Sequence, residues 1–231
     1  MNDTAMHRSV GSFVIRTRLS SLIPRSAAVI AGLFFVCLFF VDRPVAYYMS
    51  RFDKNDLRTI NQITEFGEAT PYIIGFIACG VLAVICKWLR LGSILLVGAG
   101  SVIASGLLVN IVKVFFGRWR PKLLITDAEW GFTFFAGRWE RHGFPSGHSS
   151  TVGAVVMTLI LLWPRLFPLW IAMGLLVGST RVCLNVHYVS DVIVGLYIGG
   201  LMTIVLYKLA DHLNWLKGDS PTLSAIDVPS N

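Results

Sequence analysis

Charged residues are scarce in this sequence. Only 14% of the 231 residues are charged and 55% are hydrophobic, whereas a soluble globular domain carries about a quarter charged residues. We therefore expect an all-α, polytopic membrane protein of one domain, with no room for a second. The formal net charge of +7 is modest. In a membrane chain it indicates topology and contact with anionic headgroups, and we expect no nucleic-acid partner.

The chain also lacks a cysteine pattern. No pair among its four cysteines has the spacing of a metal site or a disulfide framework. Each of them falls in or beside an apolar segment, so we interpret them as small buried hydrophobic residues. No internal repeat or low-complexity segment is evident either. The sequence gives no reason to expect a metal or another cofactor.

The first apolar run, Ala27 to Val41, is shorter than the roughly 20 residues that span a membrane. Its length would suit the core of a signal peptide, but no small-x-small cleavage site follows it. Leu22 and Ile23 can extend the run, so we predict a retained first helix. Residues 1–26 precede it as a basic tail. Within this tail, Ser12 to Ile23 suits either an amphipathic surface helix or a solvated segment.

Five more apolar segments complete a prediction of six transmembrane helices in one membrane domain, residues 27–207. These segments are 71–86, 91–116, 149–162, 167–182 and 191–207. Residues 42–70 are expected to form a polar loop with a short surface helix, and 208–231 a polar tail that is disordered at its end. Six spans put both termini on one side of the membrane. The short basic loops 87–90 and 163–166 favour the cytoplasm for that side.

Three polar side chains stand at a membrane boundary between the last two spans. His187 and Asp191 are four residues apart, which places them on one face of a helix. A carboxylate there can accept the proton of one imidazole nitrogen and leave the other nitrogen as a nucleophile or base. Arg181 adds a guanidinium suited to phosphate. Taken alone, such a His-Asp pair is more often structural than catalytic.

Two further groups of polar residues are expected on the same side of the membrane. Lys113 and Arg120 flank the end of the third span, although such cations also snorkel toward headgroups. Arg118, next to them, is equally interpretable as a headgroup anchor. Residues 145–148, Pro-Ser-Gly-His, precede a predicted helix whose N-terminus can bind an anion. In this segment Gly147 lets the backbone approach a ligand closely.

The combination of these groups is far more specific than any of them alone. Lys113 is followed after six residues by Arg120 and Pro121, then come residues 145–148, and then Arg181, His187 and Asp191 at fixed intervals. With this set the chain resembles the type 2 phosphatidic acid phosphatase family, lipid phosphatases related to vanadium haloperoxidases. The family motifs are K-x6-R-P, P-S-G-H and S-R-x5-H-x3-D. The sequence departs from them once, with Thr180 where the family usually has Ser.

The resemblance implies a role for each motif residue. Lys113, Arg120 and Arg181 would neutralise the phosphate, and the backbone at Ser146 and Gly147, with the Ser146 hydroxyl, would add donors. His187 would attack phosphorus to give a phosphohistidine, while Asp191 would fix its tautomer and stabilise the cation. His148 would protonate the leaving group and then activate water. No metal is needed in this scheme. Arg118 and Lys122 lie outside the motif positions, so we expect them to matter less than Arg120.

The implied function is a metal-independent lipid phosphatase of a bacterial inner membrane, with its site on the periplasmic face. Substrates of similar chains are phosphatidylglycerophosphate, undecaprenyl pyrophosphate, phosphatidic acid and lipid A 1-phosphate, and the sequence does not choose among them. Two alternatives are a lipid phosphotransferase that uses the same site and a non-enzymatic lipid-binding protein. A haloperoxidase is not expected, because six spans would bury the site among lipids. The aromatic residues of loop 122–144 suit an interfacial belt or an access path for a lipid tail. The oligomeric state is left open.

Overall fold

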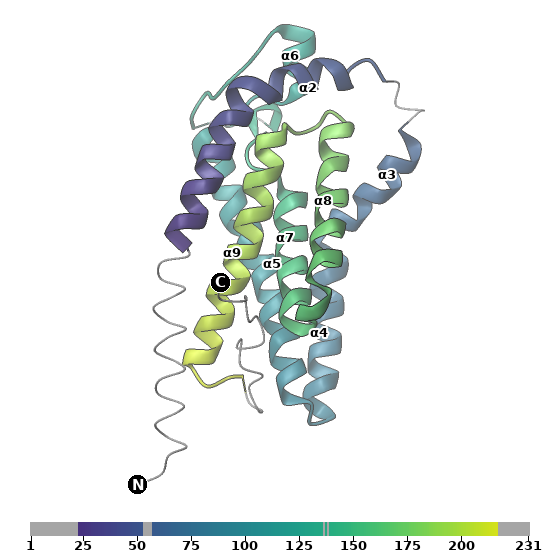
Figure 1. Ribbon diagram of the computed structural model, residues 1–231, viewed down its shortest axis with the longest axis vertical. Helices are drawn as coiled ribbons and strands as arrows, with labels where there is room; N and C mark the ends of the chain where they lie inside the picture. Colours follow the sequence, from purple (N-terminus) through teal and green to yellow (C-terminus); the bar gives the residue numbers. More distant parts are fainter. Residues whose placement is uncertain (1–22, 53–56, 136, 138, 217–231) are drawn as a thin grey trace, which may run out of the picture.

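The computed structural model describes residues 23–52, 57–135, 137 and 139–216 (Figure 1). Within these residues the chain is helical, and its extended pairing is limited to an isolated bridge between Arg118 and Phe132. The prediction of an all-α chain is therefore confirmed for the described part. The surface segment expected over residues 12–22, the rest of the tail before it and the end of the C-terminal tail lie outside the described residues.

The first helix is longer than the sequence predicts. It runs over Ile23–Met49, 27 residues, and only 6% of its most apolar window is buried inside the protein. A π-helical turn, η1 (Cys37–Val41), interrupts it before α2 (Asp42–Met49), and α2 lies across one end of the bundle (Figure 1). The expected polar loop after Val41 is therefore wrong for this stretch. The Asp42 carboxylate is not exposed in a loop. It is buried and accepts hydrogen bonds from Arg118 and from the backbone N–H of Ser190.

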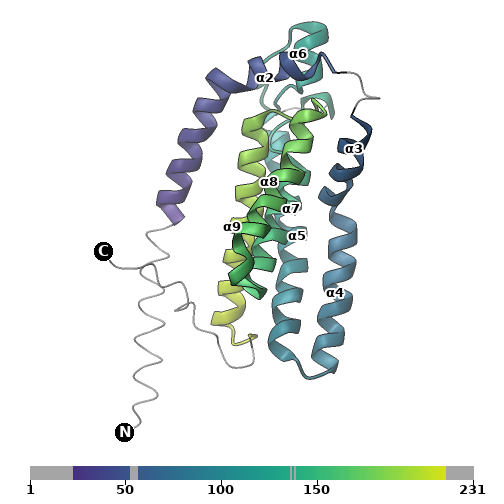
Figure 2. The same cartoon turned by 45° about the vertical axis from the view of Figure 1, so that its right-hand side comes forward.

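The next segments form a bent pair. The helical segment Arg58–Gly67 comprises α3 (Arg58–Thr64) and the short η2 (Glu65–Gly67), and it meets α4 (Ala69–Ile85) at an angle of 44°. The helix α5 (Leu89–Phe116) then returns antiparallel to α4 and packs along it (Figure 2). It ends at Gly117, whose left-handed backbone (φ 53°) turns the chain toward the basic motif.

After two short elements, the remaining long helices run back and forth between the two ends of the bundle. They are α6 (Pro121–Asp127), η3 (Trp139–Arg141), α7 (Gly147–Leu162), η4 (Pro164–Leu166), α8 (Phe167–Cys183) and α9 (Val189–His212). Figures 1 and 2 show α5, α7, α8 and α9 side by side, with α2 and α6 together at one end. The end of α5, the start of α7, the end of α8 and the start of α9 all lie at that end.

The helices α7 and α9 form the most extensive contact in the bundle. A Cβ atom on Gly199 would lie 1.9 Å from the carbonyl oxygen of Ser150, and one on Gly153 would lie 2.1 Å from that of Leu196. Both positions therefore need glycine, which lets the two backbones touch, as small residues do in membrane helix pairs. This contact fixes the N-terminus of α7 against the N-terminus of α9.

Within the residues that the structure describes, four helices are long and apolar enough to cross a membrane, or five if the bent pair counts as one span. The chain is thus an integral membrane protein, but the predicted count of six spans is not confirmed. The difference lies in α7. At 16 residues it is shorter than the roughly 20 residues of a full span. Much of α7 is instead buried inside the bundle, where it carries the second motif.

Candidate functional site

The structure brings the three motifs together at one end of the bundle. The backbone N–H of Ser146, before α7, donates to the carbonyl of Asp191 in the first turn of α9, at 3.1 Å. A Cβ atom on Gly147 would lie 3.4 Å from Nζ of Lys113, which lies in the last turn of α5. The first, second and third motifs therefore meet within contact distance, as the sequence predicts from the shared side of the membrane.

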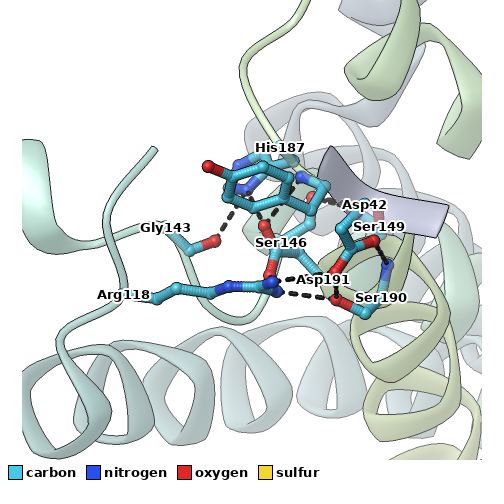
Figure 3. Close-up of polar contacts among 9 residues, drawn as sticks. Asp42, Arg118, Gly143, Ser146, Ser149, His187, Ser190 and Asp191 are labelled. Carbon is cyan, nitrogen blue, oxygen red and sulfur yellow. Dashed lines mark hydrogen bonds and ion pairs between the residues drawn. The ribbon is translucent and has the colours of Figure 1, made fainter. Parts of the chain in front are cut away.

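His187 lies in the short connection between α8 and α9, with 4% of its surface exposed. Its Nδ1 is 2.8 Å from the carbonyl oxygen of Gly143 (Figure 3). A carbonyl can only accept, so Nδ1 carries a proton and Nε2 of the neutral ring keeps its lone pair. Burial lowers the pKa of His187, an effect that Asp191 partly opposes. The imidazole is therefore neutral at pH 7, with Nε2 ready to act as a nucleophile.

Asp191 is not the direct acceptor of the His187 proton. Its Oδ2 lies 3.6 Å from Nδ1, beyond a good hydrogen bond, and accepts instead from the backbone N–H of Tyr188 at 2.8 Å. Its Oδ1 pairs with Nη1 of Arg118. The sequence suggested that Asp191 fixes the tautomer of His187. In the structure the carbonyl of Gly143 does so instead. Asp191 is placed to stabilise positive charge on the ring through space.

Arg118 has an unexpected position. Its side chain is fully buried, and Nη2 pairs with Oδ2 of Asp42 at 2.8 Å while Nη1 also donates to Oγ of Ser190 at 2.6 Å (Figure 3). The interpretation of Arg118 as a headgroup anchor is wrong. Leaving one charge of a buried pair without its partner costs about 3–5 kcal/mol, so this group constrains the fold around it.

Aromatic rings enclose the Arg118 guanidinium. The carbon Cζ lies 4.4 Å, 5.2 Å and 5.4 Å from the ring centres of Tyr188, Phe132 and Trp130. Such faces attract a cation and exclude water from it. The pKa of Arg118 is raised, because attraction to Asp191 and Asp42 outweighs its burial. Trp130 and Phe132 therefore serve as packing around a buried ion pair, which is neither of the roles expected for the aromatic loop.

Three cations lie around the two histidines of the site. Lys113 is buried in the last turn of α5, Arg181 stands in the last turn of α8, and Arg120 precedes α6. The charges of Arg120 and Arg181 act on each other and on His187. The Nε of Arg181 is buried and has no hydrogen-bond partner among the described residues, although Nη1 donates to Thr64. Clustered like charges of this kind favour an anionic ligand.

His148 occupies the second position of α7 and lies close enough to Arg181, His187 and Lys113 for their charges to interact. A Cβ atom on Gly67 would come within 2.9 Å of the His148 ring. Thr64, from the same bent segment, accepts a hydrogen bond from Nη1 of Arg181 at 2.9 Å. The segment of α3 and η2 is therefore one wall of the site, which the sequence did not indicate.

Ser146 caps α7. The fully buried hydroxyl oxygen of Ser146 accepts from the backbone N–H of Ser149 at 3.3 Å and from its hydroxyl at 2.9 Å. The hydroxyl hydrogen of Ser146 is not used in these two contacts, so it can still donate to a ligand. The N–H groups of Gly147 and His148, in the first turn of α7, have no partner within the helix, and this end of a helix favours negative charge.

Metal ligands do not cluster in the described part of the chain. Among those residues, no group of three or more His, Cys, Asp or Glu side chains is arranged to hold a metal ion. The acids Asp42 and Asp191 are both occupied by Arg118. What the described site offers instead is a neutral imidazole, a second histidine, a helix N-terminus and three cations. That set suits the binding of a phosphate and nucleophilic attack on it.

Comparisons with known proteins agree with this arrangement. Residues 93–215 match the PAP2 superfamily. The chain is 44% identical over 110 residues to a lipid A 1-phosphatase of Rhizobium etli, 46% of this chain and 47% of that protein. It is 41% identical over 110 residues to a lipid A 1-phosphatase of Rhizobium johnstonii, 46% of this chain and 45% of that protein. The chain thus spans about half the length of these curated relatives.

A solved structure shares the fold. It is that of a transmembrane PAP2-type phosphatidylglycerolphosphate phosphatase from Bacillus subtilis, with a TM-score of 0.51 and 19% identity, covering 80% of this chain and 96% of that one. The matched family region contains all three motifs. The motif residues, their convergence at one end of the bundle and this match lead to one conclusion: the chain belongs to the PAP2 superfamily.

Proposed function

We propose that the protein is a membrane phosphatase that removes a phosphate group from a lipid through a phosphohistidine at His187. The observation that supports this most strongly is the hydrogen bond from Nδ1 of His187 to the Gly143 carbonyl. It leaves the Nε2 lone pair free in a site whose positive charge suits a phosphate. Lipid A 1-phosphate is the first candidate substrate, because two relatives above 40% identity are named lipid A 1-phosphatases.

The first chemical step is displacement at phosphorus. The phosphate is held by Lys113, Arg120 and Arg181 and by donors at the N-terminus of α7. The Nε2 lone pair of His187 forms a bond to phosphorus while the bond from phosphorus to the lipid oxygen breaks. The negative charge of the bound phosphate favours the protonated form of His148, which gives its proton to the departing oxygen and becomes neutral. The positive charge that the His187 ring gains in this step is stabilised by the Gly143 carbonyl and by the nearby Asp191 carboxylate.

The second step releases inorganic phosphate. His148, now neutral, takes a proton from a water molecule whose oxygen attacks phosphorus, and the bond from phosphorus to Nε2 of His187 breaks. The free enzyme is regenerated with its original proton count. If another hydroxyl replaced water, the same residues would transfer phosphate to a second molecule, which defines the phosphotransferase alternative.

The proposal includes a location. We infer a bacterial inner membrane with the site on the periplasmic face and with α7 as an additional, inner crossing helix. The support is the distribution of basic residues at the end of the bundle opposite the site. Lys87 and Arg90 lie at the turn from α4 to α5, Arg165 lies in η4, and Lys208 lies near the end of α9. Such residues favour the cytoplasmic side.

The direct test is phosphate release by the purified protein in detergent. The substrates are lipid A 1-phosphate, phosphatidylglycerophosphate, phosphatidic acid and undecaprenyl pyrophosphate, each with and without a chelator. We expect lipid A 1-phosphate to be hydrolysed fastest, turnover to survive chelation, and orthovanadate to inhibit it. His187→Ala is the matched inactive control. Activity that disappears in chelator and returns with magnesium would contradict the mechanism, and label passing from donor lipid to another lipid would identify a transferase.

The two histidines should respond differently to the leaving group. We expect His187→Ala to remove turnover of every substrate, because the nucleophile is gone. His148→Ala should lose on the order of 10²–10⁴-fold with a lipid monoester, whose leaving oxygen needs a proton. The formation of the phosphoenzyme should be affected far less with p-nitrophenyl phosphate, whose leaving group needs none. Rapid-quench kinetics with both substrates measures this difference, and an equal loss for both would exclude His148 as the acid.

The wall formed by Gly67 provides an independent test of His148. We expect Gly67→Ala to displace the His148 ring, because the added Cβ would lie 2.9 Å from it. A misplacement of this size lowers turnover of a lipid monoester by up to about 10²-fold. The matched control is Gly75→Ala on α4, where an added Cβ meets nothing within 4 Å. The measurement is the steady-state kcat of the two variants. Equal values would contradict the prediction, because His148 would then tolerate the displacement.

A further inference from the structure

We propose that Arg118 and Asp42, neither of which is a signature residue of the three motifs, are positioning residues that hold His187 and Asp191 in their reactive arrangement. The inference deepens the proposed function and rests on it for the identity of the nucleophile. It assigns to these two residues a role in the reaction without contact with the substrate. Three independent features of the structure support it.

The first feature is the side chain of Arg118. Its two terminal nitrogens bridge two carboxylates, with Nη1 on Oδ1 of Asp191 and Nη2 on Oδ2 of Asp42. A guanidinium has a rigid fork of donors, so this pairing fixes the position of each carboxylate relative to the other. Asp191 can therefore not turn toward His187 or away from it without breaking a buried ion pair.

The second feature is the backbone of Arg118. Its carbonyl accepts the N–H of Gly143 at 2.9 Å, and the carbonyl of Gly143 accepts Nδ1–H of His187 at 2.8 Å. A Cβ atom on Gly143 would lie 2.8 Å from the Arg118 carbonyl oxygen, so the contact is close. Arg118 thus supports both groups that face His187, one through its side chain and the other through its main chain.

The third feature is the way Asp42 joins the first helix to this arrangement. Its Oδ1 accepts the backbone N–H of Ser190 at 3.0 Å, and its Oδ2 accepts the Ser190 hydroxyl in addition to Arg118. Ser190 immediately precedes Asp191. The carboxylate follows directly on the π-helical turn η1, where the helix changes its hydrogen bonding. The first helix is therefore tied to the residue next to Asp191.

Direct contact with the substrate is not the role of either residue. The side chains of Arg118 and Asp42 are both fully buried, and rings of Tyr188, Phe132 and Trp130 lie over the guanidinium. The cations that remain for the phosphate are those of the motifs. Substitution of a positioning residue should therefore lower kcat and leave the affinity for phosphate analogues little changed.

The proposal also predicts the direction in which each substitution shifts the pKa of His187, which a purely structural role would not. The charged and titratable groups that act on His187 are Asp191 from α9, Arg120 before α6, Arg181 from α8 and His148 from α7. Removing the charge of Arg118 leaves Asp191 less neutralised, which should raise the pKa of His187. Removing the charge of Asp42 leaves Arg118 acting more strongly on Asp191, which should lower it.

The experiment compares Arg118→Gln, Asp42→Asn and the double variant with the full-length wild-type protein in detergent. The pKa of His187 is read by NMR titration of protein labelled with 15N-histidine, assigned by the signal that His187→Ala lacks. We expect opposite shifts for the two single variants and a value nearer wild type for the double one. Each single variant should lower kcat by at least about tenfold, with orthovanadate inhibition little changed. Lys122→Gln, which changes an exposed neighbouring cation, is the control that should behave as wild type.

The contrary outcomes are distinct. Shifts of the same sign, or no shift in folded variants, would overturn the proposal, and so would vanadate affinity that falls in parallel with kcat. If Arg118→Gln does not fold, the milder Asp42→Asn decides alone, and if neither folds the two residues are structural and the proposal fails. The titration needs no substrate. A wild-type protein that releases no phosphate from any lipid would therefore refute the proposed function while leaving the opposite shifts to be tested.

Discussion

A single buried arginine between two buried carboxylates links the parts of this protein that must act together. Arg118 joins Asp42 of the first helix to Asp191 of the last one, and its carbonyl accepts the N–H of Gly143, which contacts His187. Such a group is costly to bury and more costly to leave half-paired. The positions of α2, of the loop after α5 and of the start of α9 are therefore not independent of one another.

Around this ion pair the site separates two kinds of charge. The carboxylates are neutralised internally by Arg118, whereas Lys113, Arg120 and Arg181 bring positive charge to the space around His187. Burial lowers the pKa of Arg120, and a bound anion would reverse part of that penalty. The same surroundings keep His187 neutral. These charges suit the binding of a phosphate, and a neutral imidazole keeps the lone pair that the proposed attack on phosphorus requires.

The sequence predicted those parts of the structure that are written in local patterns. Apolar runs located most of the helices, and the motif spacings identified Lys113, His148 and His187. Contacts between distant segments have no such pattern. Asp42 and Arg118 are 76 residues apart, and the sequence placed Asp42 in a polar loop and made Arg118 interpretable as a headgroup anchor. The six-span count was not confirmed because α7 is shorter than a full span and much of it is buried inside the bundle.

Contacts made by backbone groups and by closely packed residues could not be predicted from the sequence either. The proton of His187 is accepted by the backbone carbonyl of Gly143. Every residue has such a carbonyl, so the sequence pattern pointed to the carboxylate of Asp191 instead. Gly67 and Thr64 became part of the site only because α3 and η2 bend over the N-terminus of α7. An acid placed directly after an apolar run, as Asp42 is, was the one local sign that the first helix does more than anchor the chain.

The central claim is that His187 attacks phosphorus through Nε2 while Gly143 holds Nδ1. An experimental structure of the protein with orthovanadate, which mimics the five-coordinate phosphorus of the displacement, tests it most directly. The account predicts vanadium bonded to Nε2 of His187, oxygens facing Lys113, Arg120 and Arg181, and an unchanged hydrogen bond from Nδ1 to the Gly143 carbonyl. Vanadium bonded to His148, or to His187 through Nδ1, would contradict it.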